Sequence, residues 1–210
     1  EGKFSDAMVL FKSLNGYENS EEKIKECEDK VYSEEYKSTS IGDYIKFGTY
    51  EQDNKAKNGK EEIEWLVLDK RDGKVLVISK YALACQPYNT QNTDAVWETC
   101  YLRSWLNRGF INSAFSSAEQ AKIPATTVVN SDDENDNTTD KIFLLSPDEA
   151  IEYIDERKCA ATDYAIANGV WTRGEYLDGK PTCYWWLRSN DTGGMADNIS
   201  DGGALCSTSI

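Results

Sequence analysis

Residues 63–79 read IEWLVLDKRDGKVLVIS, and this stretch does most to decide the fold class. Its two halves, IEWLVLD and KVLVIS, are rich in the β-branched and large apolar residues that favour strands. They are joined through Arg71, Asp72 and Gly73, and an Asp-Gly pair supplies the positive φ angles that a tight hairpin needs. The stretch therefore predicts an antiparallel β-hairpin.

The hydrophobic period changes on both sides of this hairpin. Upstream, Ile45, Phe47 and Thr49 alternate with other residues at the spacing of a strand. Downstream, we expect a compact strand at 141–146 (KIFLLS) and further short strands from CYWWLRS at 183–189 onward. Helical spacing and capping residues predict helices near 99–109, 116–123, 146–154 and 161–167. This order indicates an α+β fold with mainly antiparallel strands and peripheral helices, in which the two β-rich portions meet in one layered body.

The N-terminal residues 1–38 follow a different pattern from the rest of the chain. Apolar residues recur there at helical spacing in two short segments, separated by Asn15-Gly16. The pattern predicts a helical hairpin, similar to one copy of a bacterial repeat that occurs in tandem, and we expect further copies upstream. The main domain is expected at 41–210.

Composition and charge exclude several classes of function. The chain has 210 residues, a formal net charge of -14 and no histidine. The negative charge disfavours nucleic acid as a partner, and no apolar run is long enough for membrane insertion by this segment. The absence of histidine removes the usual general base, the commonest metal ligand and the common nucleophile–histidine pairs.

The six cysteines form no Cys-x-x-Cys motif, so neither a zinc ribbon nor a thioredoxin-like motif is present. Their even number is compatible with disulfides in an exported protein. Buried free thiols that behave as small apolar residues are an equal alternative. The sequence leaves the pairing open.

Several segments together resemble the bacterial domain-of-unknown-function family six-two-seven-three. They are GDYIKFGTYEQ, IEWLVLDK, LACQPYN, WETCYLRSWLN, FSSAEQAKI, DKIFLLSPDEA and YWWLRS, within residues 41–200. The resemblance implies a C-type-lectin-like fold, distantly similar to formylglycine-generating enzymes and to the variable ligand-binding proteins of diversity-generating elements. Formylglycine-generating enzymes use two closely spaced cysteines, which Cys183 and Cys206 do not match.

The chain departs from this family at its end. Members usually continue past the Gly-rich run into a final strand, whereas this sequence stops at CSTSI. The comparison therefore predicts that the last strand is missing from the domain. Without it, the sheet would keep an unpaired edge.

Two groups of residues are candidates for ligand binding. Along CYWWLRS, alternation places Trp186 and Arg188 on one face, where they could stack on a sugar or peptide and donate bidentate hydrogen bonds. The alternative is a core Trp with an Arg paired to a carboxylate. The second group is Tyr88, Asn89, Trp97 and Arg103, where lectin-like domains gather recognition side chains. Its alternative is a packed cover over the sheet.

Acidic residues suggest one weak metal site. Asp132, Glu134 and Asp136 place several oxygen ligands close together, as calcium prefers, although the glycine of an EF-hand loop is missing. A solvated turn explains the same run. Asp148 and Glu149 are explained by capping of a helix start. No other cofactor and no catalytic set is expected.

The leading hypothesis is a non-enzymatic recognition domain of a bacterial cell-envelope or extracellular protein that binds a glycan, peptide or protein. A second hypothesis is an enzyme related to formylglycine-generating enzymes with an unrecognised site. A third is a structural module of a larger protein. A shallow aromatic surface would favour recognition, and a pocket with converging polar groups would favour an enzyme.

Overall fold

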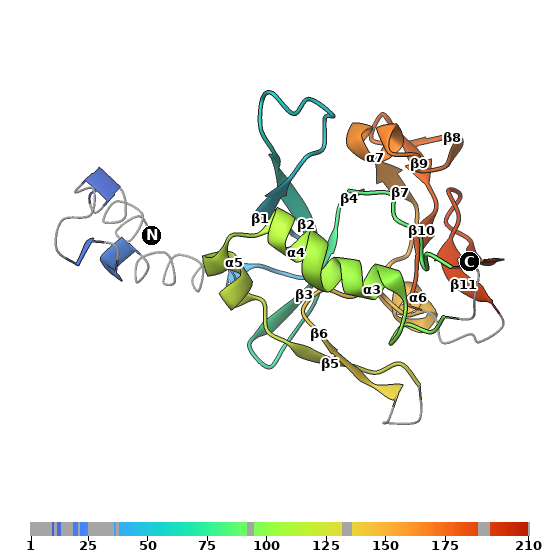
Figure 1. Ribbon diagram of the computed structural model, residues 1–210, viewed down its shortest axis with the longest axis horizontal. Coiled ribbons are helices and arrows are strands. Elements are labelled where there is room, and N and C mark those ends of the chain that lie inside the picture. The colour runs from blue at the N-terminus through green and yellow to red at the C-terminus, as the bar shows by residue number, and fades with distance from the viewer. Residues whose placement is uncertain are drawn as a thin grey trace.

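The computed structural model describes residues 38–91, 95–131, 136–188 and 194–209, together with residues 10, 12–13, 19–20, 22–24 and 36. Within these ranges the protein has an α+β fold of small, mostly antiparallel sheets with helices packed against them, as the sequence predicts (Figure 1). The predicted hairpin at 1–38 lies almost entirely outside the described residues. Among the helices that the structure describes, none combines the length and the apolar character needed to cross a bilayer.

The predicted β-hairpin forms part of a three-stranded antiparallel sheet. Its strands are β1 (Tyr44–Tyr50), β2 (Glu61–Arg71) and β3 (Lys74–Ser79), in that order. Asp72 and Gly73 make the turn with φ angles of 53° and 71°, which is the geometry expected of an Asp-Gly hairpin. The hairpin prediction is therefore confirmed.

A single helical run covers one face of this sheet. It comprises α3 (Tyr101–Trp105), the π-helical turn η1 (Leu106–Phe110) and α4 (Ile111–Ala114). Cys100 caps this run, which continues past Gly109 to Ala114, beyond the helix that the sequence predicted near 99–109. Gly109 lies within the run, and a Cβ there would lie only 3.0 Å from the Trp105 ring, so the missing side chain makes room for that ring.

The remaining helices follow their capping signals. Ser116 caps α5 (Ser117–Lys122) and Ser146 caps α6 (Pro147–Tyr153), each in a complete capping box with Glu119 and Glu149 respectively. The third helix, α7 (Asp163–Ala167), is capped by the hydroxyl of Thr162. The three predicted helices and the two predicted capping boxes are confirmed.

The strand predicted at 141–146 is not formed. At the start of this segment the backbone bonds to a side chain instead of to a neighbouring strand: the Asn107 carboxamide oxygen accepts from the backbone N–H groups of Lys141 and Ile142 at 2.9 and 3.2 Å. Its NH₂ group donates to the Ile142 carbonyl at 2.8 Å. Because side chains satisfy this backbone, an apolar run with strand composition stays irregular.

Three further sheets complete the fold. A four-stranded sheet has the order β4-β7-β9-β8, a second has the order β10-β11-β12, and β5 pairs with β6. Their bounds are β4 Tyr81–Ala82, β5 Thr126–Val128, β6 Thr138–Asp140, β7 Cys159–Ala161, β8 Thr172–Leu177, β9 Lys180–Cys183, β10 Trp185–Trp186, β11 Met195–Ile199 and β12 Leu205–Ser209. All described pairings except β4 with β7 are antiparallel.

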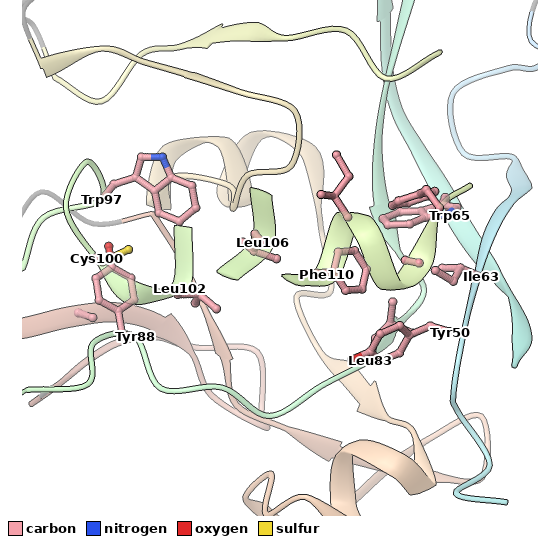
Figure 2. Close-up of a cluster of buried hydrophobic side chains, with 14 of the residues drawn as sticks. Tyr50, Ile63, Trp65, Leu83, Tyr88, Trp97, Cys100, Leu102, Leu106 and Phe110 are labelled. Atoms are coloured by element: carbon pink, nitrogen blue, oxygen red, sulfur yellow. The ribbon is translucent and has the colours of Figure 1, made fainter. Parts of the chain in front are cut away.

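The sheet β1-β2-β3 lies between two hydrophobic clusters, one on each face. The first contains Val75 and Val77 of β3 together with the apolar side of the α3–α4 run, part of which is shown in Figure 2. The second contains Leu76 and Ile78 on the opposite face. Trp186 packs against the first cluster and Trp185 against the second. The β-rich portions from both halves of the chain therefore share one body, as the sequence predicts.

Gly48 is required by the close approach of β1 to the end of the helical run. Its φ is +72°, and a Cβ there would lie 2.5 Å from the Phe115 ring and 2.8 Å from the Ala114 carbonyl oxygen. We expect Gly48→Ala to lower the free energy of unfolding by about 2–3 kcal/mol, from left-handed strain plus overpacking. Urea denaturation measures it. Gly59→Ala is the matched control, because Gly59 has φ +92° with open space around it. Equal losses in both variants would show that the contact with Phe115 is unimportant.

Candidate functional site

Tyr88 and Trp97, predicted to bind ligand, are core residues. Trp97 is 0% exposed and Tyr88 is 1% exposed (Figure 2). The Trp97 indole N–H donates to Asp140 Oδ2 at 3.1 Å, which satisfies the polar edge of the buried ring. Asn89 is half-buried and donates to the Gln91 carbonyl at 3.2 Å. For these aromatic residues the structure matches the packed cover that the sequence left open.

Arg103, the fourth member of that group, pairs with a carboxylate in the interior. Its Nε donates to Asp140 Oδ1 at 2.8 Å and to Oδ2 at 3.0 Å, and one terminal nitrogen donates to the Glu98 carbonyl at 2.8 Å. Thr138 donates to Asp140 Oδ2 at 2.7 Å. Asp140 is 3% exposed and joins three segments of the chain. Sequence reasoning missed Asp140, because an acidic residue at the end of a short polar strand is expected to be exposed to solvent.

Arg188 is also buried, which corrects the expectation that its face of the strand is wet. It is 3% exposed, and its guanidinium makes two hydrogen bonds of 3.1 Å to the Glu149 carboxylate. It also donates to the carbonyls of Val129 and Leu144. Glu149 therefore caps α6 and holds Arg188, whereas the sequence predicted only capping. The arrangement is the Arg–carboxylate alternative considered for this strand.

Trp186 differs from the other predicted binding residues, because it is only half-buried. Its indole N–H donates to the Gln86 carbonyl at 3.0 Å, and its ring meets Tyr88 edge-to-face with centroids 5.6 Å apart. These contacts fix the ring while part of it stays accessible. Of the two aromatic residues placed in the leading binding hypothesis, Trp97 and Trp186, only Trp186 could contact a ligand.

Of the acidic candidates for a metal site, the structure describes only Asp136. Asp132 and Glu134 lie outside the described residues, and Asp136 accepts a hydrogen bond from the Ser131 hydroxyl at 2.6 Å. Elsewhere in the described chain one oxygen from each of three carboxylates, Glu51, Asp53 and Glu61, lies within 4.8 Å of the others. Local donors, led by the Asn58 side chain, lower the pKa of Asp53. These oxygens are engaged by their own loop.

A large groove runs beside β3, and we call it the β3 groove. It has a volume of about 1640 Å³. Its lining includes all of β3, both residues of β10, and the segment 141–145. Trp171 and Tyr184 also line it, with rings stacked at 4.9 Å between centroids and Arg173 over the Trp171 ring at 4.5 Å. Trp171 is 55% exposed, so this end of the groove presents an accessible aromatic surface.

The outer edge of β3 is open toward this groove. Among the described strands, β3 pairs with β2 alone. The Lys80 N–H donates to the Glu64 carbonyl, and backbone directions alternate along a strand. The backbone groups of Val75, Val77 and Ser79 therefore point away from β2, and no described residue bonds to them there.

The outer edge of β10 borders the same groove and is only partly paired. β10 pairs with β11. On its other side the Arg188 N–H donates to the Leu145 carbonyl at 2.8 Å, which leaves Trp186 as the open residue. Trp186 packs against the first cluster, as Val75 and Val77 of β3 do. Trp185 packs against the second cluster, as Leu76 and Ile78 do. Two strand edges with matching faces thus border one groove.

Comparison with known proteins identifies the family of this domain. The family model described as Domain of unknown function (DUF6273) matches residues 72–209, well over half of the chain. No curated protein and no solved structure matches the chain. The matched range includes β3, the α3–α4 run, Arg188 and both edges of the β3 groove. The chain therefore belongs to the DUF6273 family of domains.

Proposed function

We propose that this domain is a non-enzymatic recognition module of a bacterial cell-envelope or extracellular protein, and that it binds an extended apolar polypeptide segment in the β3 groove. The observation that carries the proposal is the open edge of β3 beside a groove that β10 also borders. A peptide added to an exposed strand edge gains affinity from main-chain hydrogen bonds and specificity from its side chains.

The two clusters define the chemistry of the bound segment. A strand beside β3 would have the first cluster on one face and the second cluster on the other. Strands buried on both faces are apolar at successive positions instead of alternating with polar residues. The ligand is accordingly a short run such as Val-Ile-Val-Ile, without charges in its middle.

The accessible aromatic surface supports recognition at one end of this groove. Trp171, Tyr184 and Trp186 supply ring area, and Arg173 forms no ion pair among the described residues. Arg173 is held over the Trp171 ring and can donate to a carboxylate or carbonyl of the bound segment.

A C-type-lectin-like fold is part of the same proposal. It is supported by membership of the family and by the mixture of helices with small antiparallel sheets. In such a scaffold, rigid sheets hold the loops and edges that contact a ligand. The envelope location rests on analogy with the fold that the family resemblance implies.

The binding test uses a peptide with six alternating Val and Ile residues and one Lys at each end. We expect binding by calorimetry, and slowed hydrogen exchange at the amides of Val75, Val77 and Ser79. A peptide of the same sequence, N-methylated at alternate residues, keeps its apolar surface and charge but loses donors on one edge. It should bind at least about tenfold more weakly, a difference of about 1.4 kcal/mol.

Variants of the protein locate the site. Val77→Pro removes one outward N–H group without removing a bond to β2, so the fold should survive while peptide affinity falls about tenfold. A thermal melt checks the fold. Tyr176→Ala is the control, since Tyr176 is 67% exposed and outside the groove. Equal binding of the N-methylated peptide, or loss of binding in Tyr176→Ala, would exclude strand pairing with β3.

A further inference from the structure

Two cysteines face one another across neighbouring strands. Cys159 of β7 and Cys183 of β9 are direct partners in the antiparallel register. Residues in such pairs have Cα atoms about 4.5 or 5.5 Å apart, and disulfides form at Cα separations of about 4.4–6.8 Å. Both sulfurs leave the sheet on the same face, because directly opposed residues share a face. The backbone therefore places these two thiols within reach of each other.

A third thiol lies close to this pair. Cys85 follows β4, and β4 pairs in parallel with β7 through Tyr81–Ala160 and Ala82–Ala161. Hydrogen bonding to Cys159, followed by burial and the proximity of Cys159 and Cys85, raises the pKa of the Cys183 thiol. All three cysteines are free thiols in the structure. The sequence places them at distant positions and predicted no pairing among them.

We propose that Cys159 and Cys183 form a reversible disulfide when the protein is exposed to a disulfide oxidant such as glutathione disulfide, and that Cys85 is not part of the bond. The pairing rests on the strand register, which favours Cys159 over Cys85 as the partner of Cys183. The bond would link both ends of the segment that carries α7, Trp171 and the β8–β9 hairpin. The proposal does not rest on peptide binding, although Cys159 and Trp171 also line the β3 groove.

The chemistry follows from the exposure of the two thiols. Cys159 is half-buried and Cys183 is 0% exposed, so the oxidant reaches Cys159 first. The Cys159 thiolate attacks one sulfur of glutathione disulfide, which forms a mixed disulfide and releases one glutathione thiolate. The Cys183 thiolate then attacks the Cys159 sulfur and releases the second. Two protein thiols lose two protons and two electrons, and one glutathione disulfide becomes two glutathione molecules.

The type of strand pairing indicates that the bond is easily reduced. The Thr162 N–H donates to the Ala82 carbonyl, so the backbone of Cys159 points the other way, toward β9. Cys159 and Cys183 are therefore a hydrogen-bonded pair, the wider of the two antiparallel spacings. Closing a disulfide there requires the two Cβ atoms to come closer than they usually lie in such a pair, which strains the bond. Strained disulfides are more easily reduced.

Peptide mapping tests the pairing. The reduced, folded protein is incubated with glutathione disulfide, free thiols are alkylated, and the digest is analysed by mass spectrometry without reduction. We expect one linked pair of peptides, containing Cys159 and Cys183. Linking the chain across this segment should raise the Tm by about 5 °C, and a low concentration of dithiothreitol should reverse the rise.

Variants and the dependence on pH distinguish a bond between Cys159 and Cys183 from a bond through Cys85. Cys159→Ser should lose the link and the rise in Tm, whereas Cys85→Ser should keep both. The link should form faster as pH increases from 7 to 9, because the raised pKa of Cys183 leaves little thiolate at neutral pH. A link through Cys85, a rise in Tm that persists in Cys159→Ser, or thiols that all remain free would overturn the proposal. None of these outcomes depends on whether the groove binds a peptide.

Discussion

Arg188→Ala is expected to lower the free energy of unfolding by about 3–5 kcal/mol. The side chain is 3% exposed and connects the start of α6, through Glu149, to the carbonyls of Val129 and Leu144. Truncation would leave the Glu149 carboxylate without its cation and two carbonyls without their donor. The Glu149 side chain is 33% exposed and keeps part of its solvent, so most of this loss comes from the cavity and from the two carbonyls, each unsatisfied buried group costing about 1–3 kcal/mol.

Urea denaturation with an unchanged m-value measures this loss. Arg188→Lys keeps the charge but not the planar fork, so it should lose about half as much, because a single ammonium does not replace the paired donors. Arg173→Ala is the matched control: Arg173 is exposed and lies over the Trp171 ring, and its loss should be within about 1 kcal/mol. A similar cost for Arg188 and Arg173 would mean that the buried pair contributes nothing special.

Local signals in the sequence predicted local structure well. The Asp72-Gly73 turn and the capping boxes at Ser116 and Ser146 depend on residues within a few positions of each other. Their geometry is fixed by φ preferences and by short side-chain-to-backbone bonds. Such features need no knowledge of the rest of the fold.

Features set by distant partners were predicted poorly. The segment at 141–146 has strand composition, but Asn107 supplies its hydrogen bonds from the helical run. The helical run itself continues past Gly109, where the absent side chain leaves room for the Trp105 ring. In both places a partner far away or a packing contact overrides local propensity.

The candidate site shows the same limit. Trp97, Arg103 and Arg188 have the residue types of a recognition surface, yet each uses its donors inside the protein, on Asp140, on Glu149 or on backbone carbonyls. The same donors would serve to bind a ligand, so composition alone does not separate the two roles. What separates them is burial, which depends on the arrangement of both β-rich portions. Trp186 is the predicted residue that stays accessible within the groove.

Asp140→Ala is expected to lower the free energy of unfolding by about 3–4 kcal/mol. Asp140 accepts from Trp97, Arg103 and Thr138 at 2.7–3.1 Å, so its removal would leave the buried indole N–H of Trp97 and the Nε–H of Arg103 without their acceptors. Each buried donor left unsatisfied costs about 1–3 kcal/mol, with more for a charged group. The loss should appear in urea denaturation and as a shift in the fluorescence of Trp97.

Two further variants separate the charge of Asp140 from its geometry. Asp140→Asn keeps one acceptor oxygen and the side-chain shape, so it should lower the free energy of unfolding by about 1–2 kcal/mol less than alanine does. The remaining loss comes from the lost pairing with Arg103. Asp197→Ala removes a carboxylate whose described partner is the exposed Ser207 hydroxyl, and should cost less than about 1 kcal/mol. If Asp140→Ala were as mild as Asp197→Ala, Trp97 and Arg103 would have to find other acceptors. The segment 95–103 would then be held mainly by apolar packing of its rings and not by its polar contacts.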